Sequence, residues 1–371
     1  MPRFATGVVS RVLEERGRLA RVTVLVGDQE RRAAAFTDIT GPLCCGDRVV
    51  VNTTAVDLAL GTGGEDFVLW NLEATTAGEL CGGHILKLRY TPWQIDIMAA
   101  EAPESEHHEV MAAADSLEGM PVVAAAVHSQ LPGVLAVLRR RRPDLRLAYL
   151  MTDAAALPIA HSDLVAALLE RGLIDATLTC GHAVGGDLEC VNVFSGLAAA
   201  RRVAGADVTV VGMGPGIVGT ATLLGHSAME QGQTLSAAGA LGGRPVAVLR
   251  ISFAEPRERH RVLSHHSLSA LRYAALARSI VAVPRLEEAH LSQVMARLEA
   301  GGITERHEIR VVDADEALEA LESFDLRPTT MGRDPSRDPD YFKAAAAAGI
   351  IAAELARGQG ENPDQGGGDE S

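Results

Sequence analysis

The stretch Asp207–Gly219, Asp-Val-Thr-Val-Val-Gly-Met-Gly-Pro-Gly-Ile-Val-Gly, decides the fold that we expect for this chain. A β-branched run over residues 208–211 leads into closely spaced glycines, and an amphipathic segment follows. The glycines are Gly212, Gly214, Gly216 and Gly219. This pattern predicts a buried strand that turns sharply into a helix and presents backbone N–H groups to a ligand, most often a phosphate.

The glycine loop differs from a dinucleotide-binding fingerprint in its acidic partner. That fingerprint needs an Asp or Glu about twenty positions further on, at the end of the next strand. Here Glu230 lies on the expected helix, and the next strand ends near residues 251–252. A dinucleotide is therefore disfavoured. An anion bound by the loop backbone and close helix–strand packing without a ligand both remain open, and the sequence assigns no cofactor.

From residue 120 onward, apolar runs of strand length alternate with amphipathic helical segments. The expected strands cover residues 121–127, 145–151, 176–180, 208–211, 246–251, 280–283 and 308–312. The expected helices cover residues 131–141, 161–171, 191–204, 217–231, 265–278, 287–299, 314–323 and 340–356. The alternation is typical of repeated βαβ units. Residues 119–356 are thus predicted to form an α/β domain with a doubly wound, mainly parallel, Rossmann-like sheet.

The first 75 residues have a different pattern, with short β-rich runs separated by turns. These runs cover residues 8–9, 20–26, 32–36, 47–52 and 67–72. No helical period competes with them, so residues 1–75 are expected to form a small β-barrel-like domain. Residues 76–118 are interpreted as a linker. Residues 357–371 are almost devoid of apolar side chains and are expected to be disordered.

Composition excludes several classes of function. A formal net charge of -14 argues against binding to nucleic acid or to an anionic membrane, because both require a basic surface. The dense basic run Arg139–Arg142 is expected at the solvated end of a helix. No apolar run approaches the length of a membrane span, and five irregularly spaced cysteines imply no disulfide framework. A cytoplasmic protein is the expectation.

Ligands of open α/β sheets bind outside the carboxyl ends of the strands. In this chain the residues that follow the strands are unusually polar. Asp153 follows the second expected strand of the α/β domain and His182 the third, while Arg257, Arg259 and His265 follow the fifth. If these strands lie parallel in one sheet, their side chains converge on one edge.

The segment 255–266 is the densest polar cluster of the chain. Arg257 and Arg259 are candidates for clamping a phosphate or carboxylate. Ser264 is suited to cap a helix that starts at His265. His265 and His266 are candidate acid–base groups, although adjacent histidines are not expected to face the same way on a helix, so one should point outward. The alternative is a solvated basic loop before a capped helix.

Cys180, His182 and Asp187 offer thiolate, imidazole and carboxylate groups within a short glycine-rich segment. Metal sites use such donors, but this spacing matches no structural zinc pattern. A glycine-rich loop with a buried cysteine is the alternative. We assign no metal from the sequence, and the question of a metal at these three residues stays open.

Four segments together resemble one family of bacterial proteins, found mainly in actinobacteria and firmicutes and catalogued as a domain of unknown function. They are Leu60-Gly-Thr-Gly-Gly, Gly83-His-Ile-Leu-Lys-Leu-Arg-Tyr-Thr-Pro, Gly212-Met-Gly-Pro-Gly-Ile-Val-Gly-Thr and Ser264-His-His. The resemblance covers residues 1 to about 355. It implies no activity, cofactor or catalytic residue.

The sequence therefore predicts an enzyme or binding protein for a small anionic metabolite, phosphorylated or nucleotide-like. The backbone of Gly212–Gly219 would hold the anion, and Arg257 with Arg259 would neutralise it. His265 or His266 would act as acid or base, with Asp153 and His182 completing the site. The alternative is a non-catalytic regulator or scaffold that senses a metabolite and binds a partner through its β domain. Homo-oligomerisation is left open.

Overall fold

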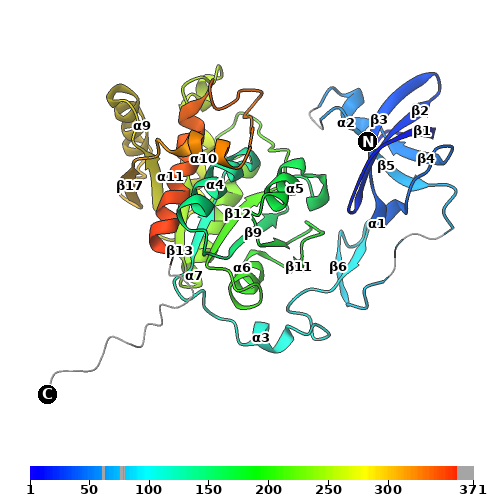
Figure 1. The fold of residues 1–371 in the computed structure, drawn as a ribbon, viewed down its shortest axis with the longest axis horizontal. Helices are drawn as coiled ribbons and strands as arrows, with labels where there is room; N and C mark the ends of the chain where they lie inside the picture. The colour runs from blue at the N-terminus through cyan, green and yellow to red at the C-terminus, as the bar shows by residue number, and fades with distance from the viewer. Residues whose placement is uncertain (61–62, 76–77, 79, 357–371) are drawn as a thin grey trace. The chain divides into compact units, whose positions relative to one another are not determined.

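The computed structural model describes residues 1–60, 63–75, 78 and 80–356 of the chain. The tail for which disorder is expected, residues 357–371, lies outside the described residues. The chain forms two compact units (Figure 1). The barrel unit comprises residues 1–98 and 158–165, and the sheet unit comprises residues 99–157 and those from 166 onward.

The barrel unit contains a closed barrel of five strands in the order β1-β2-β3-β5-β4. These strands are β1 Phe4–Arg16, β2 Leu19–Val26, β3 Gln29–Phe36, β4 Arg48–Asn52 and β5 Asp66–Asn71. Inward-facing side chains alternate along the strands, so that Val22, Val24, Ala33, Ala35 and Val49 pack together inside. The expectation of a small β-barrel is confirmed. The remaining elements of this unit are α1 Thr37–Thr40, α2 Thr54–Asp57, β6 Ile85–Lys87 and β7 Ile95–Ile97.

The sheet unit is built on eight parallel strands in the order β11-β10-β9-β12-β8-β13-β16-β17. Their bounds are β8 Pro121–Ala124, β9 Leu147–Thr152, β10 Ala176–Thr179, β11 Leu188–Glu189, β12 Val208–Met213, β13 Arg244–Val248, β16 Ile280–Pro284 and β17 Glu308–Val312. The glycine-rich strand β12 is inserted between β9 and β8. Strands β9 and β12 are neighbours in the sheet. The chain runs from β9 to β10 on one side and from β12 to β13 on the other side, so the two connections diverge.

Helices connect the strands. They are α3 His108–Ala112, α4 Leu131–Arg141, α5 Asp163–Glu170, α6 Val193–Arg202, α7 Glu230–Ala240, α8 His265–Ser269, α9 Glu288–Ala300, α10 Ala317–Ser323 and α11 Pro339–Leu355. Short 3₁₀ turns cover His128–Gln130, Ile159–His161, Ser227–Met229 and Glu258–His260, and a π-helix covers Ala270–Ala274. A two-stranded ribbon, β14 Ile251–Ser252 with β15 Val262–Leu263, precedes α8.

Helices cover both faces of the sheet. Leu150 of β9 lies beside Val211 of β12, and it packs against Gly196 of α6. The next residue of β12, Gly212, points to the other face, where a side chain would contact Leu131 of α4. Successive residues of a strand face opposite sides, so α6 and α4 lie on opposite faces. This arrangement makes the unit an α/β fold with a parallel sheet, as the sequence predicted.

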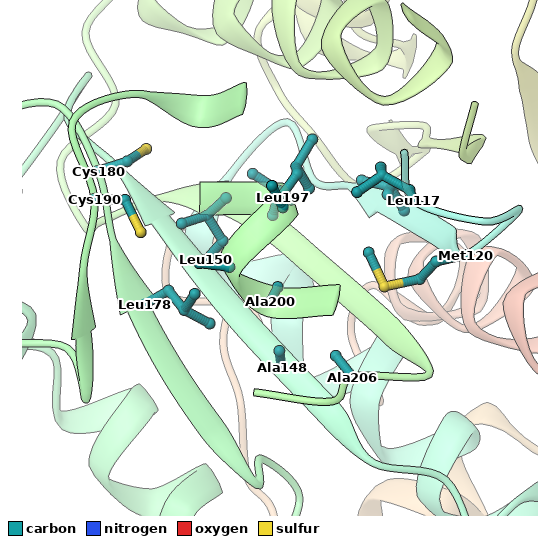
Figure 2. Close-up of a cluster of buried hydrophobic side chains, with 14 of the residues drawn as sticks. Leu117, Met120, Ala148, Leu150, Leu178, Cys180, Cys190, Leu197, Ala200 and Ala206 are labelled. Carbon is teal, nitrogen blue, oxygen red and sulfur yellow. The ribbon is translucent and has the colours of Figure 1, made fainter. Parts of the chain in front are cut away.

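Figure 2 shows the core on the α6 face of the sheet. Leu150 and Leu178 from the strands meet Leu197 from α6, and all three are fully buried. Cys180 and Cys190 belong to the same buried cluster. These two thiols therefore take part in hydrophobic packing.

The prediction of a helix over residues 217–231 is wrong. After β12 the chain forms an irregular loop in which Gly219 and His226 make an isolated β-bridge, and α7 begins only at Glu230. Within this loop, Thr220 donates its N–H to the carbonyl of Gly225. Such local bonds satisfy the backbone without a helix, and glycine and threonine have low helix propensity. The glycine loop therefore does not lead directly into a helix N-terminus.

The helix expected at residues 265–278 is α-helical only over His265–Ser269 and continues as a π-helix to Ala274. The remaining helix predictions are confirmed within a few residues, including the end of α4 at the basic run. There Arg139 pairs with Asp175 and Arg141 pairs with Glu316. Among the described parts of the chain, no helix combines the length and the apolar character that crossing a bilayer demands.

Candidate functional site

Asp153 and His182 are neighbours at the carboxyl edge of the sheet. The backbone N–H of His182 donates to Oδ2 of Asp153 at 2.9 Å, which ties the segment after β10 to the end of β9. Asp187 lies elsewhere, because its Oδ2 accepts from both the N–H and the hydroxyl of Thr177, each at 2.8 Å. Cys180 lies in the hydrophobic core on the α6 face of the sheet.

The four glycines have separate structural roles. Gly214 lies so close to the chain after β9 that a Cβ would come within 2.4 Å of the carbonyl oxygen of Ala156. Gly216 has a φ of 108°, a left-handed conformation that favours glycine. Gly219 lies against His266, where a Cβ would come within 3.2 Å of Nε2. Gly212 belongs to β12, so only the last three glycines shape the loop.

The two arginines predicted as anion clamps are differently engaged. Arg257 forms a bidentate pair with Glu255, with Nε 2.7 Å from Oε1 and Nη2 3.0 Å from Oε2. This pairing holds the pKa of Glu255 at about 2. Arg259 is exposed, and its Nε donates to Nε2 of His260 at 3.3 Å.

Three imidazoles gather beside Gly219, and we call His226, His265 and His266 the histidine cluster. One ring nitrogen from each lies within 4.8 Å of the others. The rings of His226 and His266 stack with centroids 4.0 Å apart, and the rings of His265 and His266 are 4.4 Å apart. The expectation that one of the adjacent histidines points outward is wrong. These residues are the first two of α8, where the chain has only begun to turn.

Most ring nitrogens of the histidine cluster are buried without a hydrogen bond. Within the described residues, no partner with good geometry reaches either nitrogen of His226, Nε2 of His265 or Nδ1 of His266. His226 and His266 are 7% and 4% exposed. Buried polar atoms normally have partners, so unpartnered nitrogens in one place indicate a site for an ion or a ligand.

His260 lies beside the cluster but is fully engaged. A guanidinium only donates, so Nε2 of His260 accepts from Arg259 and its Nδ1 carries the proton. That Nδ1 donates to the hydroxyl oxygen of Ser264 at 2.7 Å. The same oxygen accepts the backbone N–H of His266 and caps α8, as the sequence predicted for Ser264.

Arg250 supplies a buried positive charge next to these histidines. Its side chain is 6% exposed, and its nearest carboxylate oxygen, on Glu255, is 3.6 Å away. That carboxylate is already bound by Arg257 and by Arg333 at 3.1 Å. Among the described residues, no hydrogen bond from the Arg250 guanidinium is found. The buried guanidinium of Arg250 thus has Glu255 as an ion-pair partner at 3.6 Å, but none of its five N–H donors makes a hydrogen bond among the described residues.

Burial and positive neighbours keep the histidines neutral. Burial lowers the pKa of His226 and of His265, although the carbonyl of Leu223 opposes this effect at His226. Burial, followed by the influence of His226, lowers the pKa of His266 to about 2. Burial, followed by the charge of Arg250, lowers the pKa of His260 to about 3. At neutral pH all four imidazoles offer uncharged nitrogens.

A second titratable group lies at the start of α7. The hydroxyl of Thr152 donates to Glu230 at 2.6 Å, and burial together with the charge of Asp153 raises the pKa of Glu230 to about 7. A carboxyl that titrates near neutral pH is suited to acid–base chemistry.

A model of a family described as "Protein of unknown function (DUF3866)" matches residues 32–349. The chain belongs to the DUF3866 family. A search of curated proteins finds no match. This match confirms the resemblance to a domain of unknown function and adds no activity to the geometry.

In this DUF3866 protein, three residues of the site escaped the sequence analysis. His226 stands far from His265 along the chain, and only the loop after β12 brings it to α8. Arg250 lies inside the strand expected at residues 246–251, whereas β13 ends at Val248, so the sequence did not place it at the edge of the sheet. Glu230 was noted only as a misplaced acidic residue, because its contact with Thr152 depends on the order of the strands.

Proposed function

We propose that this protein is an enzyme or binding protein for a small anionic metabolite, phosphorylated or nucleotide-like, and that Arg250 anchors the anion. One observation carries the proposal: a guanidinium that is 6% exposed and makes no hydrogen bond among the described residues. Arginine matches the geometry of phosphate and carboxylate, and a desolvated guanidinium without hydrogen bonds is costly unless a ligand completes it.

The position of Arg250 in the fold supports an anion site. It lies two residues after the end of β13, at the carboxyl edge of the parallel sheet. We class this sheet as doubly wound and Rossmann-like, a class in which ligands bind at the carboxyl edge where neighbouring connections diverge. The connections that leave β9 and β12 diverge in this way.

Arg250 replaces Arg257 and Arg259 as the main anchor in this proposal. Arg257 is neutralised by Glu255, and Arg259 is exposed. Within the glycine loop, Val218 donates its N–H to the hydroxyl of Ser227, so this amide is not open to a ligand. Gly214 and Gly216 let this loop lie close to the end of β9.

Acid–base chemistry is the reaction type that the edge supports. Glu230, with a pKa of about 7, gives and takes a proton near neutral pH. Asp153 lies close enough to raise that pKa by its charge. A metabolite held by Arg250 with a reacting atom near these carboxyls would undergo proton transfer. A sensor would need only the Arg250 anchor to bind its ligand, whereas an enzyme would also need Glu230 for proton transfer. Turnover that is lost on substitution of Glu230 therefore distinguishes an enzyme from a sensor.

The test is thermal unfolding of the full chain, treated with a chelator, in increasing inorganic phosphate, ATP and a sugar phosphate. A ligand that binds the folded state adds about 2.7 kcal/mol at 100 times its Kd. Arg250→Met should abolish the rise in Tm. Arg261→Met removes the same charge from an exposed position nearby and should leave the rise intact. An equal rise in the wild type and in Arg250→Met would refute the anchor.

A further inference from the structure

We propose that the histidine cluster, His226, His265 and His266, binds a divalent transition-metal ion, with Zn²⁺ as the best fit. The proposal adds a site to the anion anchor and does not depend on it. Its basis is the meeting of three imidazoles from two separate segments, the loop after β12 and the first turn of α8.

The donor set favours zinc over harder cations. Imidazole nitrogen suits Zn²⁺, Cu²⁺, Ni²⁺ and Fe²⁺, whereas Mg²⁺ and Ca²⁺ prefer oxygen ligands. Three protein ligands with one open position are the arrangement of catalytic zinc sites, and four ligands that of structural ones. No carboxylate belongs to the cluster, so the bound ion would keep its full charge of +2 and attract a water, a hydroxide or an anion.

The unpartnered nitrogens are the second line of support. Four buried ring nitrogens of the cluster lack a hydrogen bond of good geometry among the described residues, although the carbonyl of Leu223 lies near His226. Histidines that only fill a core normally donate one ring N–H to a carbonyl or a carboxylate, as the buried His307 does toward the carbonyl of Leu271. A metal ion would satisfy one nitrogen from each of His226, His265 and His266 at once.

The surroundings hold the ligands in place. Ser264 fixes the start of α8 by capping it, and His260 fixes the Ser264 hydroxyl in turn. Gly219 leaves space for the ring of His266, because any side chain there would meet its Nε2. These contacts limit the freedom of the ligands before an ion arrives, which lowers the cost of binding.

Metal binding requires a small rearrangement of the rings. A tetrahedral Zn²⁺ with bonds of about 2.0–2.1 Å brings its nitrogens to about 3.3 Å from one another. The cluster is wider, with nitrogens up to 4.8 Å apart, and the stacked rings of His226 and His266 lie nearly parallel. Rotation of one ring about χ2 would aim its nitrogen at a point shared with the other two. The X-ray absorption spectrum of the zinc-loaded protein should therefore show three imidazole nitrogens bound to one ion.

The experiment measures metal on the full chain without a histidine tag. The protein is stripped with a chelator, loaded with Zn²⁺ or Co²⁺, desalted and analysed by elemental mass spectrometry. We expect about one ion per chain, and for Co²⁺ the visible absorption of a tetrahedral site. His226→Ala and His266→Ala should each reduce the content to below about 0.2 ion per chain. His107→Ala, at a part-exposed histidine outside the cluster, should retain it.

Two outcomes would overturn the proposal. One is a wild-type protein that retains no Zn²⁺ or Co²⁺ after desalting. The other is undiminished loading of folded His226→Ala and His266→Ala proteins. If those variants do not fold, X-ray absorption of the zinc-loaded wild type decides, since fewer than three nitrogen neighbours from imidazole contradict the site. No anion enters these measurements, and the phosphate titration is done on stripped protein, so the two proposals fail separately.

Discussion

The hydroxyl of Thr152 donates a 2.6 Å hydrogen bond to the carboxyl of Glu230, joining the last residue of β9 to the first residue of α7. Burial raises the pKa of this carboxyl to about 7 from an ordinary value of 4.5. Between about pH 4.5 and pH 7, therefore, the carboxyl of Glu230 holds a proton in the folded protein and has released it in the unfolded chain.

Glu230 should make stability fall as the pH rises. Its contribution is greatest below about pH 4.5, declines between about 4.5 and about 7, and is constant above that range. The decline amounts to about 3 kcal/mol. Glu230→Gln, which stays neutral, should remove this part of the pH dependence and stabilise the protein at pH 8. Urea unfolding of the wild type and of Glu230→Gln at pH 5 and pH 8 measures the free energy of unfolding of each. The same pH dependence in both proteins would show that Glu230 holds no proton in the folded state.

Arg21 should be critical to the barrel unit. It is 8% exposed and pairs with Glu14 at 2.6 Å, Glu65 at 3.1 Å and Asp163 at 2.9 Å. Arg21→Met takes one guanidinium away from three carboxylates at once, of which that of Glu65 is buried, and should cost about 3–5 kcal/mol. Arg32→Met removes an exposed partner and should cost less than about 1 kcal/mol.

Tryptophan fluorescence measures the unfolding of the barrel unit, and therefore the loss of stability caused by Arg21→Met. The two tryptophans of the chain, Trp70 and Trp93, both belong to that unit. A shift in the fluorescence transition of Arg21→Met, with no comparable shift for Arg32→Met, is the expected result. Equal effects would mean that the buried network adds nothing beyond surface charge.

Gly349→Ala should destabilise the protein although alanine is the better helix former. Gly349 lies in α11, and a Cβ there would come within 2.4 Å of the carbonyl oxygen of Val134 in α4. Backbone cannot move aside as a flexible side chain does, so the clash should outweigh the helical gain of about 1 kcal/mol and cost about 1–3 kcal/mol net. Ser292→Ala, on the exposed face of α9, should change stability by less than about 0.5 kcal/mol. Chemical denaturation followed by far-ultraviolet circular dichroism distinguishes the two, and a stabilised Gly349→Ala would disprove the close approach.

Ser264→Ala should cost more than the loss of an ordinary helix cap. Removing the hydroxyl frees the N–H of His266 and also leaves Nδ1–H of His260 without its acceptor. The expected loss is about 2–3 kcal/mol. Asn192→Ala removes the exposed cap of α6 and should cost about 1 kcal/mol. Equal losses in thermal unfolding would show that His260 gains nothing from Ser264.

Local patterns along the chain were enough to predict the kinds of element and their approximate places. Short β-rich runs between turns in the first 75 residues and the strand–helix alternation after residue 120 are local patterns, so they predicted the barrel and the parallel sheet. Ser264 as a helix cap was equally local. The helix placed at 217–231 was the main local error, because hydrogen bonds within the loop after β12 compete with helix formation.

The tertiary structure alone decided which polar groups meet. The strand order inserts β12 between β9 and β8, which sets α7 against the end of β9 and gives Glu230 its partner. The loop after β12 carries His226 to His265 and His266, and packing buries Arg250 beside them. Such contacts depend on pairings between distant strands and on burial, and neither quantity is encoded in the pattern of neighbouring residues.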